Sequence, residues 1–532
     1  MIPRSHILPN SNMSGIACDR PYSLTKSRFM AGRQCLKRMY LDVHHRNLRT
    51  PMTEAQQALF DFGHLFGECT HQRFPEGVLV PFHQHEPDAA LSTTQALVTD
   101  RKVPAIFEAA FLFDDILIRT DILERQADDS WHLIECKSTT SVKEAHYWDI
   151  ALQAYVLRGC NINVRRYSVM HINRGYRRGS ALNVERFLRC TDVSPDTQRV
   201  SKQIPPQVKT MKHLLMAPKP PHAEPGPHCW QPYPCEFWAH CTKKKTAQWV
   251  GYLPDGERQI RKLVARGVHT FEEIPEGFHL STLQRHAVQQ TEWRSPHLET
   301  VMKRLCYPIH YLHLEAAWSG IPLYPGMRPY ERVPFQWTTL RESERGIVNR
   351  KDWVELSHEK APMLAFLESL VDRVGTKGAI VIYSDAVLGT LQSLRQRSSV
   401  GATQKRAIGD LLGRCIDIRE IIRSMYYHPM IHYGVYDAIP RGDTSIAQIA
   451  QILPDPHRYQ LLSTLDNGWA SRSYRSIAAG GMAEVAVRNF RAQVLARGRQ
   501  AVQALYAVRQ LMTAASVQST SHLGIAQHSL AG

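Results

Sequence analysis

The sequence lacks any long apolar run. No stretch of about 18 consecutive apolar residues, the length of a bilayer-spanning helix, occurs among the 532 residues. Residues 1–14 also lack the continuous apolar core and small-residue cleavage site of a secretory signal. These absences predict a cytoplasmic protein that does not enter a membrane. Residues 1–21 and 516–532 are expected to be flexible tails.

Acidic residues are scarce relative to basic ones. Lys and Arg number 65 against 49 Asp and Glu, a formal net charge of +16, which favours a polyanionic partner, nucleic acid first and an anionic membrane surface second. Between Asn467 and Met512 the only acid is Glu484, against seven arginines. This stretch predicts a basic helical face, with a plain solvated surface as the alternative. The candidate nucleic-acid-binding residues are Arg488, Arg491, Arg497 and Arg499.

A disulfide framework is not expected either. The eleven cysteines are an odd number and are spread through the chain, so metal ligation or simple burial must explain them. Three of them, Cys229, Cys235 and Cys241, recur at six-residue steps among aromatic residues. Three thiolates require a fourth ligand to complete a metal site.

The pattern of residues 54–172 predicts an α/β unit. A helix is expected around Glu54 to Phe74, followed by three strands in the texts AIFEAAFLF, ILIRTDILE and WHLIECKS, joined by tight turns. Ser141 and Glu144 have the spacing of a capping box before a second helix. The text RRYSVMHIN then predicts a fourth strand. The expected order is helix, three-stranded meander, helix, strand.

The rest of the chain predicts two further units. A proline-rich segment, residues 217–234, excludes regular structure and places the end of the first unit near residue 245. Residues 246–298 are expected to form a helical connector. A second α/β domain is predicted over 299–515, with strands in HYLHLEAA, PFQWTTL and AIVIYS. There is no repeat of 20 to 50 residues and no glycine-rich phosphate loop.

Three charged residues of the meander are predicted to converge. Side chains alternate along a strand, so Asp121 lies on the face opposite Ile118 and Thr120, while Glu135 and Lys137 share a face. Asp121 and Glu135 would bind Mg²⁺ or Mn²⁺, and Lys137 would orient the attacking water or stabilise the developing charge. A surface salt-bridge cluster is the alternative. Apolar neighbours favour the metal site, because unpaired charges there are costly.

The text from Tyr22 to Lys245 resembles the RecB-like nucleases of the PD-(D/E)xK class. The resemblance implies a restriction-endonuclease-like core and adds Gln153 and Tyr155 of the second helix to the catalytic set. The family spacing is Q-x-x-x-Y and here it is Q-x-Y, so a place in the core is the alternative for Tyr155. In the related exonucleases of CRISPR adaptation a histidine metal ligand follows a glycine, as His71 follows Gly67 here.

The segment SRFMAGRQCLKRMYL resembles the start of the same exonucleases, where a lone cysteine precedes an arginine and an aromatic residue. Cys35, with Arg38 and Tyr40, fits that pattern. The resemblance implies a [4Fe-4S] cluster on Cys35, Cys229, Cys235 and Cys241, clasping the ends of the nuclease domain across about 200 residues. Tetrahedral zinc and unliganded cysteines are the alternatives.

The segment YLHLEAAWSGIPLYPGMRPYERVPFQWTTL resembles an uncharacterised domain found behind RecB-like nucleases, related to DnaQ-type, RNase H-like exonucleases. Such domains begin with D-x-E, and here the positions are His313 and Glu315, with Asp417 at a later acidic position. Arg497 and Ala501 stand where the family has a tyrosine and an aspartate. The loss of two acids predicts a degenerate, inactive second site.

The sequence therefore predicts a metal-dependent DNA nuclease, an exonuclease acting on single strands or ends, in DNA processing or defence against mobile elements. Other DNA-processing or defence proteins are expected partners. One alternative is a non-catalytic nucleic-acid-binding scaffold of a larger complex. The other is an RNA-processing nuclease.

Overall fold

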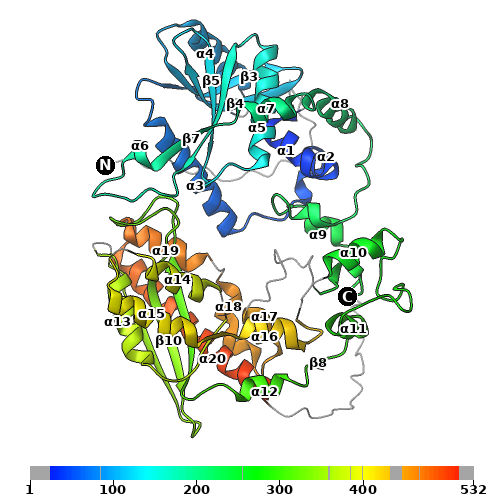
Figure 1. Cartoon of the computed structure of the whole chain (residues 1–532). Helices are drawn as coiled ribbons and strands as arrows, with labels where there is room; N and C mark the ends of the chain where they lie inside the picture. Colours follow the sequence, from blue (N-terminus) through cyan, green and yellow to red (C-terminus); the bar gives the residue numbers. More distant parts are fainter. Residues whose placement is uncertain are drawn as a thin grey trace.

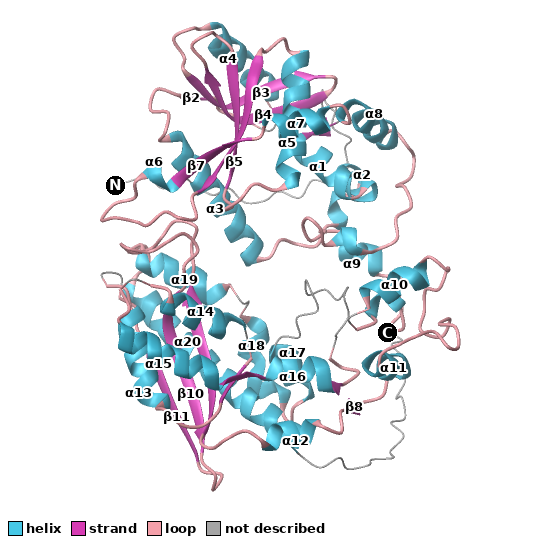
Figure 2. Ribbon diagram, viewed as in Figure 1, coloured by secondary structure: helices cyan, strands magenta, loops and turns pink. Residues whose placement is uncertain are grey.

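The computed structural model describes residues 24–83, 86–254, 256–357, 360–383, 385–397, 399–431, 446–465 and 468–513. The predicted tails, 1–21 and 516–532, lie outside these residues. The fold is mixed α/β, with one sheet in each half of the chain and a helical segment beside them (Figures 1 and 2). None of the helices in the described segments is both long and apolar enough to span a membrane.

The N-terminal half is built on a seven-stranded sheet of order β2-β3-β4-β5-β6-β7, with β1 added in parallel beside β4. The predicted meander is confirmed, because β3 to β5 pair antiparallel in chain order. The predicted fourth strand, β6, pairs parallel with β5 and antiparallel with β7. The strands are β1 Leu24–Thr25, β2 Val78–Leu79, β3 Ala105–Phe113, β4 Ile116–Arg125, β5 Trp131–Lys137, β6 Val164–Ile172 and β7 Leu188–Asp192.

Helices cover both faces of this sheet and close two apolar cores. The α5 face holds the larger core, and α3 packs against the opposite face through Phe66. The helix predicted around Glu54 is confirmed as α3. The helices are α1 Lys26–Gln34, α2 Leu36–His44, α3 Glu54–His71, α4 Pro87–Thr99, α5 Glu144–Gly159, α6 Val184–Phe187, α7 Ser194–Ser201 and α8 Ile204–Leu215, with the 3-10 turn η1 Arg46–Leu48.

The start of α5 corrects the expected capping box. Lys143 is the N-cap residue, and its backbone N–H donates to His146 Nδ1 at 3.2 Å. Ser141 instead lies two residues earlier, where its carbonyl oxygen accepts from Thr139 Oγ1 at 2.9 Å. The loop after β5 therefore uses Ser141 in its own turn, and the helix begins two residues later than the spacing predicted.

The cysteine segment and the connector share one apolar core. Cys229 and Trp238 belong to the same cluster as Trp249, Val250 and Leu253, and the rings of Trp238 and Trp249 lie 6.1 Å apart. The domain boundary expected near residue 245 therefore falls within one continuous apolar cluster. The elements here are η2 Pro227–Cys229, α9 Trp238–Thr242, η3 Val250–Tyr252, α10 Glu257–Val264, α11 Thr282–Gln289, β8 Trp293–Arg294 and α12 Leu298–Lys303.

The C-terminal half contains a five-stranded sheet of order β11-β10-β9-β12-β13, antiparallel from β11 to β9 and parallel beyond. All three predicted strands are present, as β9, β10 and β12. The strands are β9 Ile309–Ala317, β10 Val333–Glu342, β11 Val348–Val354, β12 Ile380–Ile382, β13 Cys415–Asp417 and β14 Tyr426–Tyr427, the last pairing with β8.

A 30-residue helix, α20 (Glu484–Thr513), packs along this second sheet and contributes to two apolar cores. The other helices cover the remaining surfaces (Figure 1). They are α13 Met363–Val374, α14 Asp385–Arg395, α15 Ala402–Arg414, α16 Ile418–Met425, α17 Ile446–Ile449, α18 Gln460–Thr464 and α19 Trp469–Ala478, with the 3-10 turns η4 Ala450–Ile452 and η5 Pro456–Tyr459.

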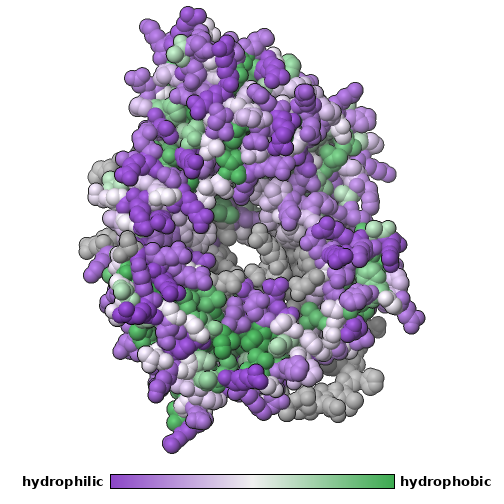
Figure 3. Space-filling model, in the orientation of Figure 1, coloured by the Kyte–Doolittle hydropathy of each residue, from purple (hydrophilic) through white to green (hydrophobic). Residues whose placement is uncertain are grey.

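The two halves contact one another through loops beside the first sheet. Arg178 Nη1 donates to Pro322 O at 2.7 Å, and the backbone of Arg178 also bonds that of Met327 at 3.0 Å. Tyr330 donates its hydroxyl proton to Ser138 O, next to the end of β5. The space-filling view shows a mostly hydrophilic face with an opening between the halves (Figure 3).

Helix α20 approaches β10 most closely at Gly498, which gives a test of this packing. A Cβ atom there would lie 2.5 Å from Thr338 Oγ1 and 2.7 Å from Gln336 Nε2, and both of those side chains are fully buried. We expect Gly498→Ala to lower the free energy of unfolding by about 1–3 kcal/mol through overpacking, measured by thermal unfolding. The control, Gly413→Ala in α15, meets no atom within 4 Å and should be stabilising by about 0.5–1 kcal/mol. Equal effects at the two positions would contradict the close approach.

Candidate functional site

The sheet opens where Asp121 lies. Pairing between β4 and β5 runs from Arg125 and Trp131 as far as Ile122 and Ile134, and no further Cα pair follows. The carboxylate of Asp121 takes over the next hydrogen bond, accepting from the backbone N–H of Cys136 at 2.6 Å. A side chain thus replaces a backbone partner, which holds the Asp121 carboxylate beside the end of β5.

Glu135 and Lys137 project from β5 to the same site. Glu135 is fully buried, and Lys137 Nζ lies 2.5 Å from its Oε1. Gln153 of α5 is also fully buried and donates to Glu135 Oε2 at 2.7 Å. The structure therefore brings together four of the predicted catalytic residues, Asp121, Glu135, Lys137 and Gln153.

Two further charged residues complete the cluster. Asp149 of α5 lies 2.9 Å from Lys137 Nζ and accepts from Gln153 Nε2 at 3.2 Å. Lys26, the first residue of α1, places its Nζ 3.0 Å from Glu135, 3.5 Å from Asp121 and 3.8 Å from Asp149. Three carboxylates thus surround one ammonium group, and a second ammonium group, that of Lys137, contacts two of them.

The pKa values reflect this crowding. Burial, reinforced by the charge of Glu135, raises the pKa of Asp121 to about 7 and also raises that of Asp149. Burial opposes ionisation of Glu135 too, but Lys137 and Lys26 outweigh it and hold its pKa well below the usual range. For Lys26, burial favours the neutral form, whereas the three carboxylates together raise its pKa. Glu135 is the fixed anion of the site, and Asp121 is the carboxyl that exchanges a proton near neutral pH.

The sequence analysis missed Lys26 and Asp149. A signal for Asp149 existed, since it stands four residues before Gln153 on one face of a helix whose neighbouring positions are apolar. Lys26 gave no such signal. It precedes Glu135 by 109 residues, and only the packing of α1 against α5 and β4 brings it to the cluster.

Glu108 of β3 lies opposite Asp121 on the adjacent strand, β4. It falls between the pairs Phe107–Ile122 and Ala109–Thr120 and has a φ of 55°, a left-handed conformation that is uncommon for a residue other than glycine. Its carboxylate lies 3.2 Å from Arg119 Nη1, and its charge contributes to raising the pKa of Asp121. Backbone strain of this kind is often found at functional sites. Here the strained residue interrupts the hydrogen-bond ladder between β3 and β4, beside the cluster.

His71 and Tyr155 make other contacts. The ring of His71 stacks on Phe107 with centroids 4.0 Å apart, and the charge of Glu108 acts on it. In the described residues no hydrogen bond or ion pair joins His71 to Asp121 or Glu135. Tyr155 is partly buried against the larger core and donates to Asp114 Oδ2 at 2.8 Å, in the turn between β3 and β4.

The donor set suits a hard divalent cation. Carboxylate and amide oxygens are ligands of Mg²⁺ and Mn²⁺, and Gln153 Oε1 is buried without a hydrogen-bond partner. No group of three or more His, Cys, Asp or Glu side chains within the described segments is already arranged to hold a metal ion. The ammonium group of Lys26 lies among the three carboxylates, where a cation would be expected.

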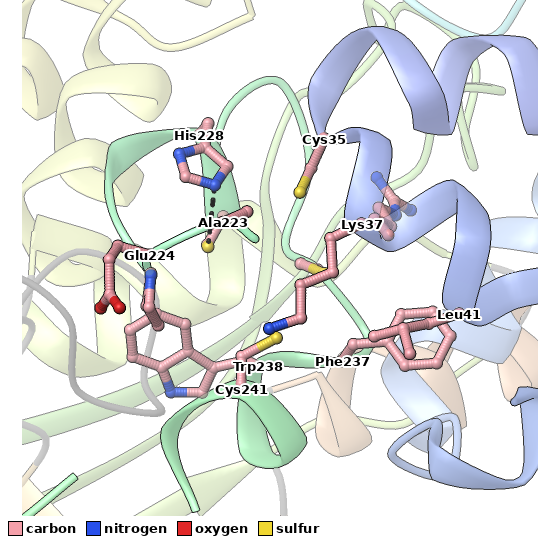
Figure 4. A pocket seen from close by; sticks show the side chains of 13 residues that line it. Cys35, Lys37, Leu41, Ala223, Glu224, His228, Phe237, Trp238 and Cys241 are labelled. Carbon is pink, nitrogen blue, oxygen red and sulfur yellow. Dashed lines mark hydrogen bonds between the residues drawn. The ribbon is translucent and has the colours of Figure 1, made fainter. Parts of the chain in front are cut away.

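The four predicted cluster cysteines line one pocket (Figure 4). Cys35 caps α2, while the other three come from residues 229–241. Lys37 and His228 extend into the same space, and His228 Nε2 lies 3.7 Å from Cys229 Sγ (Figure 4). Burial works against the Cys35 thiolate, but the hydrogen bond from His228 lowers the pKa of Cys35 overall. Burial raises the pKa of Cys235 to about 12 and raises that of Cys241 as well.

Hydrogen bonds join the two segments of this pocket directly. Gln34 Nε2 donates to His228 O at 2.8 Å and to Tyr233 O at 2.7 Å. Arg38 and Glu236 form an ion pair at 2.8 Å. Residues about 200 positions apart are thus held together by protein contacts, and the thiols gather as a result.

The predicted second site is filled by an arginine. Arg497 forms an ion pair with Glu315, and both side chains are buried. His313 Nε2 lies 3.1 Å from Glu315 Oε1. Asp417 caps α16 by accepting from the backbone N–H of Arg419 at 3.0 Å. A guanidinium group therefore neutralises Glu315 where a metal-binding site would need free carboxylates.

This burial corrects one member of the predicted basic face of α20. Arg497 is 7% exposed and offers no surface to phosphate, because the helix face that carries it packs on the sheet. Arg499 is exposed and pairs with Asp352 at 2.8 Å. Arg488 and Arg491 are exposed as well, with Arg488 3.7 Å from Glu484. Three of the four arginines therefore remain at the surface.

Comparisons with known proteins are sparse. Residues 310–435 match the family described as "Domain of unknown function (DUF2779)". No curated protein matches the chain. A solved structure described as "Crystal structure of SSO0001" aligns with a TM-score of 0.18 and 11% identity, covering 35% of this chain and 75% of that one.

Removal of Lys26 tests the charge balance of the cluster. We expect Lys26→Met to lower the free energy of unfolding in EDTA by about 3 kcal/mol, since it leaves buried carboxylates without their cation. Thermal or urea unfolding at pH 8 measures this. In Lys26→Met/Glu135→Gln the loss should be smaller, because one of the repelling charges is gone. The control Lys209→Met, on the exposed side of α8, should change stability by less than about 0.5 kcal/mol. Wild-type stability of Lys26→Met would contradict the assigned balance.

Proposed function

We propose that this protein is a metal-dependent DNA nuclease with a PD-(D/E)xK-type centre. The observation that carries the proposal is the convergence of Asp121, Glu135 and Lys137 from two adjacent strands, with Gln153 added from α5. The order α3, β3-β4-β5 meander, α5, β6 also agrees with the core order expected from the resemblance.

Each residue has a role that follows from its surroundings. Asp121, Glu135 and Asp149 would hold Mg²⁺ or Mn²⁺, which supplies Lewis-acid activation of water and of the scissile phosphate. Gln153 fixes the Glu135 carboxylate through its amide N–H. Lys137, held between Glu135 and Asp149, places a positive charge beside the reacting phosphate and stabilises the charge that develops there.

The cysteine pocket supports a proposed [4Fe-4S] clasp. Four sulfur donors lie around one space between the two ends of the nuclease half, and thiolates are the usual ligands of such clusters. Tetrahedral zinc is the alternative for the same four donors. The clasp would be structural, because it would join Cys35, near one end of the nuclease half, to residues 229–241 at its other end.

The C-terminal half is proposed to be an inactive, RNase H-like domain. Its acidic position Glu315 is already paired with a buried arginine, and Ala501 provides no ligand. The alternative function is a scaffold that binds nucleic acid while another protein cuts, and an RNA-processing enzyme is the other alternative. Participation in defence against mobile elements is proposed from the resemblance of the N-terminal half alone.

Substitution of the converging residues tests the nuclease. We expect Asp121→Ala, Glu135→Ala and Lys137→Ala each to reduce cleavage by at least about 100-fold, since each removes a ligand or the charge beside the phosphate. End-labelled single- and double-stranded DNA and RNA are incubated with Mn²⁺, Mg²⁺ or EDTA. Asp196→Ala, on α7, removes a partly exposed acid and should cut as wild type does. Undiminished cleavage by Asp121→Ala would exclude this site, and no metal-dependent cleavage by wild type would favour the scaffold.

Metal content and colour test the clasp. Protein purified aerobically should be brown, with broad absorbance at about 400 nm from sulfur-to-iron charge transfer. Elemental analysis should show that it contains iron. Cys235→Ser should lose both iron and soluble yield. Cys160→Ser, on a cysteine outside the pocket, should keep both. Colourless protein with one zinc per chain would replace the iron–sulfur proposal with the zinc alternative.

A further inference from the structure

The connection between β6 and β7 carries a group of exposed arginines that the proposed chemistry does not use. They are Arg174, Arg177, Arg186 and Arg189. Three of them line a surface recess together with Asn173, Tyr176 and Glu185. Within the described part of the chain, no Asp or Glu oxygen lies within 4 Å of these four guanidinium groups, and Glu185 is directed to Arg73 instead, at 3.7 Å. The recess is therefore positively charged.

This recess adjoins the catalytic end of the sheet. Lys137 of β5 is the register partner of His171 in β6, and His171 is the partner of Arg189 in β7. Residues directly opposite one another share a face of the sheet. Arg189 thus lies on the same face as Lys137 and two strands away, about 10 Å at the usual strand spacing. Arg189 therefore places a positive charge on the Lys137 face of the sheet, and Arg177 and Arg186 line the recess beside Arg189.

The loop that carries the arginines is held rigidly. Asn173 Nδ2 donates to Arg186 O at 2.9 Å, and Tyr176 accepts from the backbone N–H of Asn183 at 2.9 Å. Arg177 and Arg178 bond backbone oxygens of the C-terminal half, at 3.1 Å and 2.7 Å. A preorganised loop loses little conformational entropy when a ligand binds, and in Figure 1 this loop descends from β7 and α6 to the second half.

We propose that Arg177, Arg186 and Arg189 form a track that binds the phosphodiester backbone of single-stranded DNA and leads it to Lys137 and the carboxylates. The planar guanidinium group binds phosphate oxygens through paired hydrogen bonds, and such contacts position a strand without reading its sequence. The proposal rests on the proposed nuclease function and names the surface that binds its substrate. It also gives the C-terminal half a role, because that half supports the loop.

Charge reversal in the track tests the proposal in the full-length protein. Arg186→Glu/Arg189→Glu is compared with wild type by fluorescence anisotropy, using a short fluorescein-labelled single-stranded DNA in EDTA, so that no cleavage is required. We expect the Kd to rise at least about tenfold near physiological salt. The slope of log Kd against log salt should fall by about 1.4, or about 0.7 for each lost phosphate contact. Arg186→Gln/Arg189→Gln should give a smaller loss in the same direction.

The matched control reverses two arginines at the far end of β6, the strand next to β7. Arg165 and Arg166 are exposed, with surface partners Asp128 and Asp192, and they lie about 20 Å from His171 along β6. Arg165→Glu/Arg166→Glu makes the same change in net charge and should leave the Kd within about twofold. Circular dichroism melts of all variants confirm folding.

The outcomes separate this proposal from the nuclease proposal. Loss of binding in the track variant alone supports the track, even if wild type cuts no DNA. Equal loss in the control variant, or wild-type binding and cleavage by the track variant, overturns the track and leaves the nuclease standing. Absence of wild-type binding to the DNA overturns it too, and points to an acidic protein partner. Tighter binding of an RNA of the same sequence overturns the assignment to DNA.

Discussion

The fully buried carboxylate of Glu135 is the constraint on which the N-terminal half depends. A lone buried anion is very costly, and here two ammonium groups and one amide N–H surround it. Those partners come from α1, β5 and α5, so the requirement to neutralise one carboxylate fixes how three elements pack. Asp121 and Asp149 then share the same cations, and burial together with the charge of Glu135 raises the pKa of both carboxyl groups.

The C-terminal half also contains a buried carboxylate, and a different kind of cation neutralises it. Glu315 is buried on β9, and Arg497 of α20 neutralises it through an ion pair. An arginine keeps its charge at any ordinary pH, and its side chain occupies the space beside the carboxylate. The pair satisfies the fold without any bound ion. The two buried acids therefore have different partners: ammonium groups from two elements surround Glu135, whereas the arginine beside Glu315 is enclosed between helix and sheet.

Contacts between the halves reach the end of β5 that carries Lys137. Tyr330 bonds Ser138, the residue after Lys137, and Arg178 bonds the backbone of residues 322 and 323. Gly320 allows Phe62 of α3 to approach closely, since a Cβ there would meet the Phe62 ring. The second half therefore supports the β5 loop and the β6–β7 connection at once, and its packing can influence the geometry of the charged cluster.

The sequence by itself determined the central strands of both sheets, β3 to β6 and β9, β10 and β12, and the convergence of Asp121, Glu135 and Lys137, but not β7 or β11. Period-two alternation within a strand and a short turn between strands fix which side chains share a face, and both are local properties. Tertiary structure alone decided the rest. Lys26 enters the cluster, Arg497 is buried rather than exposed, and Trp249 joins the cysteine segment to the connector. Each depends on packing between segments distant in the chain, and helical or strand periodicity does not specify which distant element a face will meet.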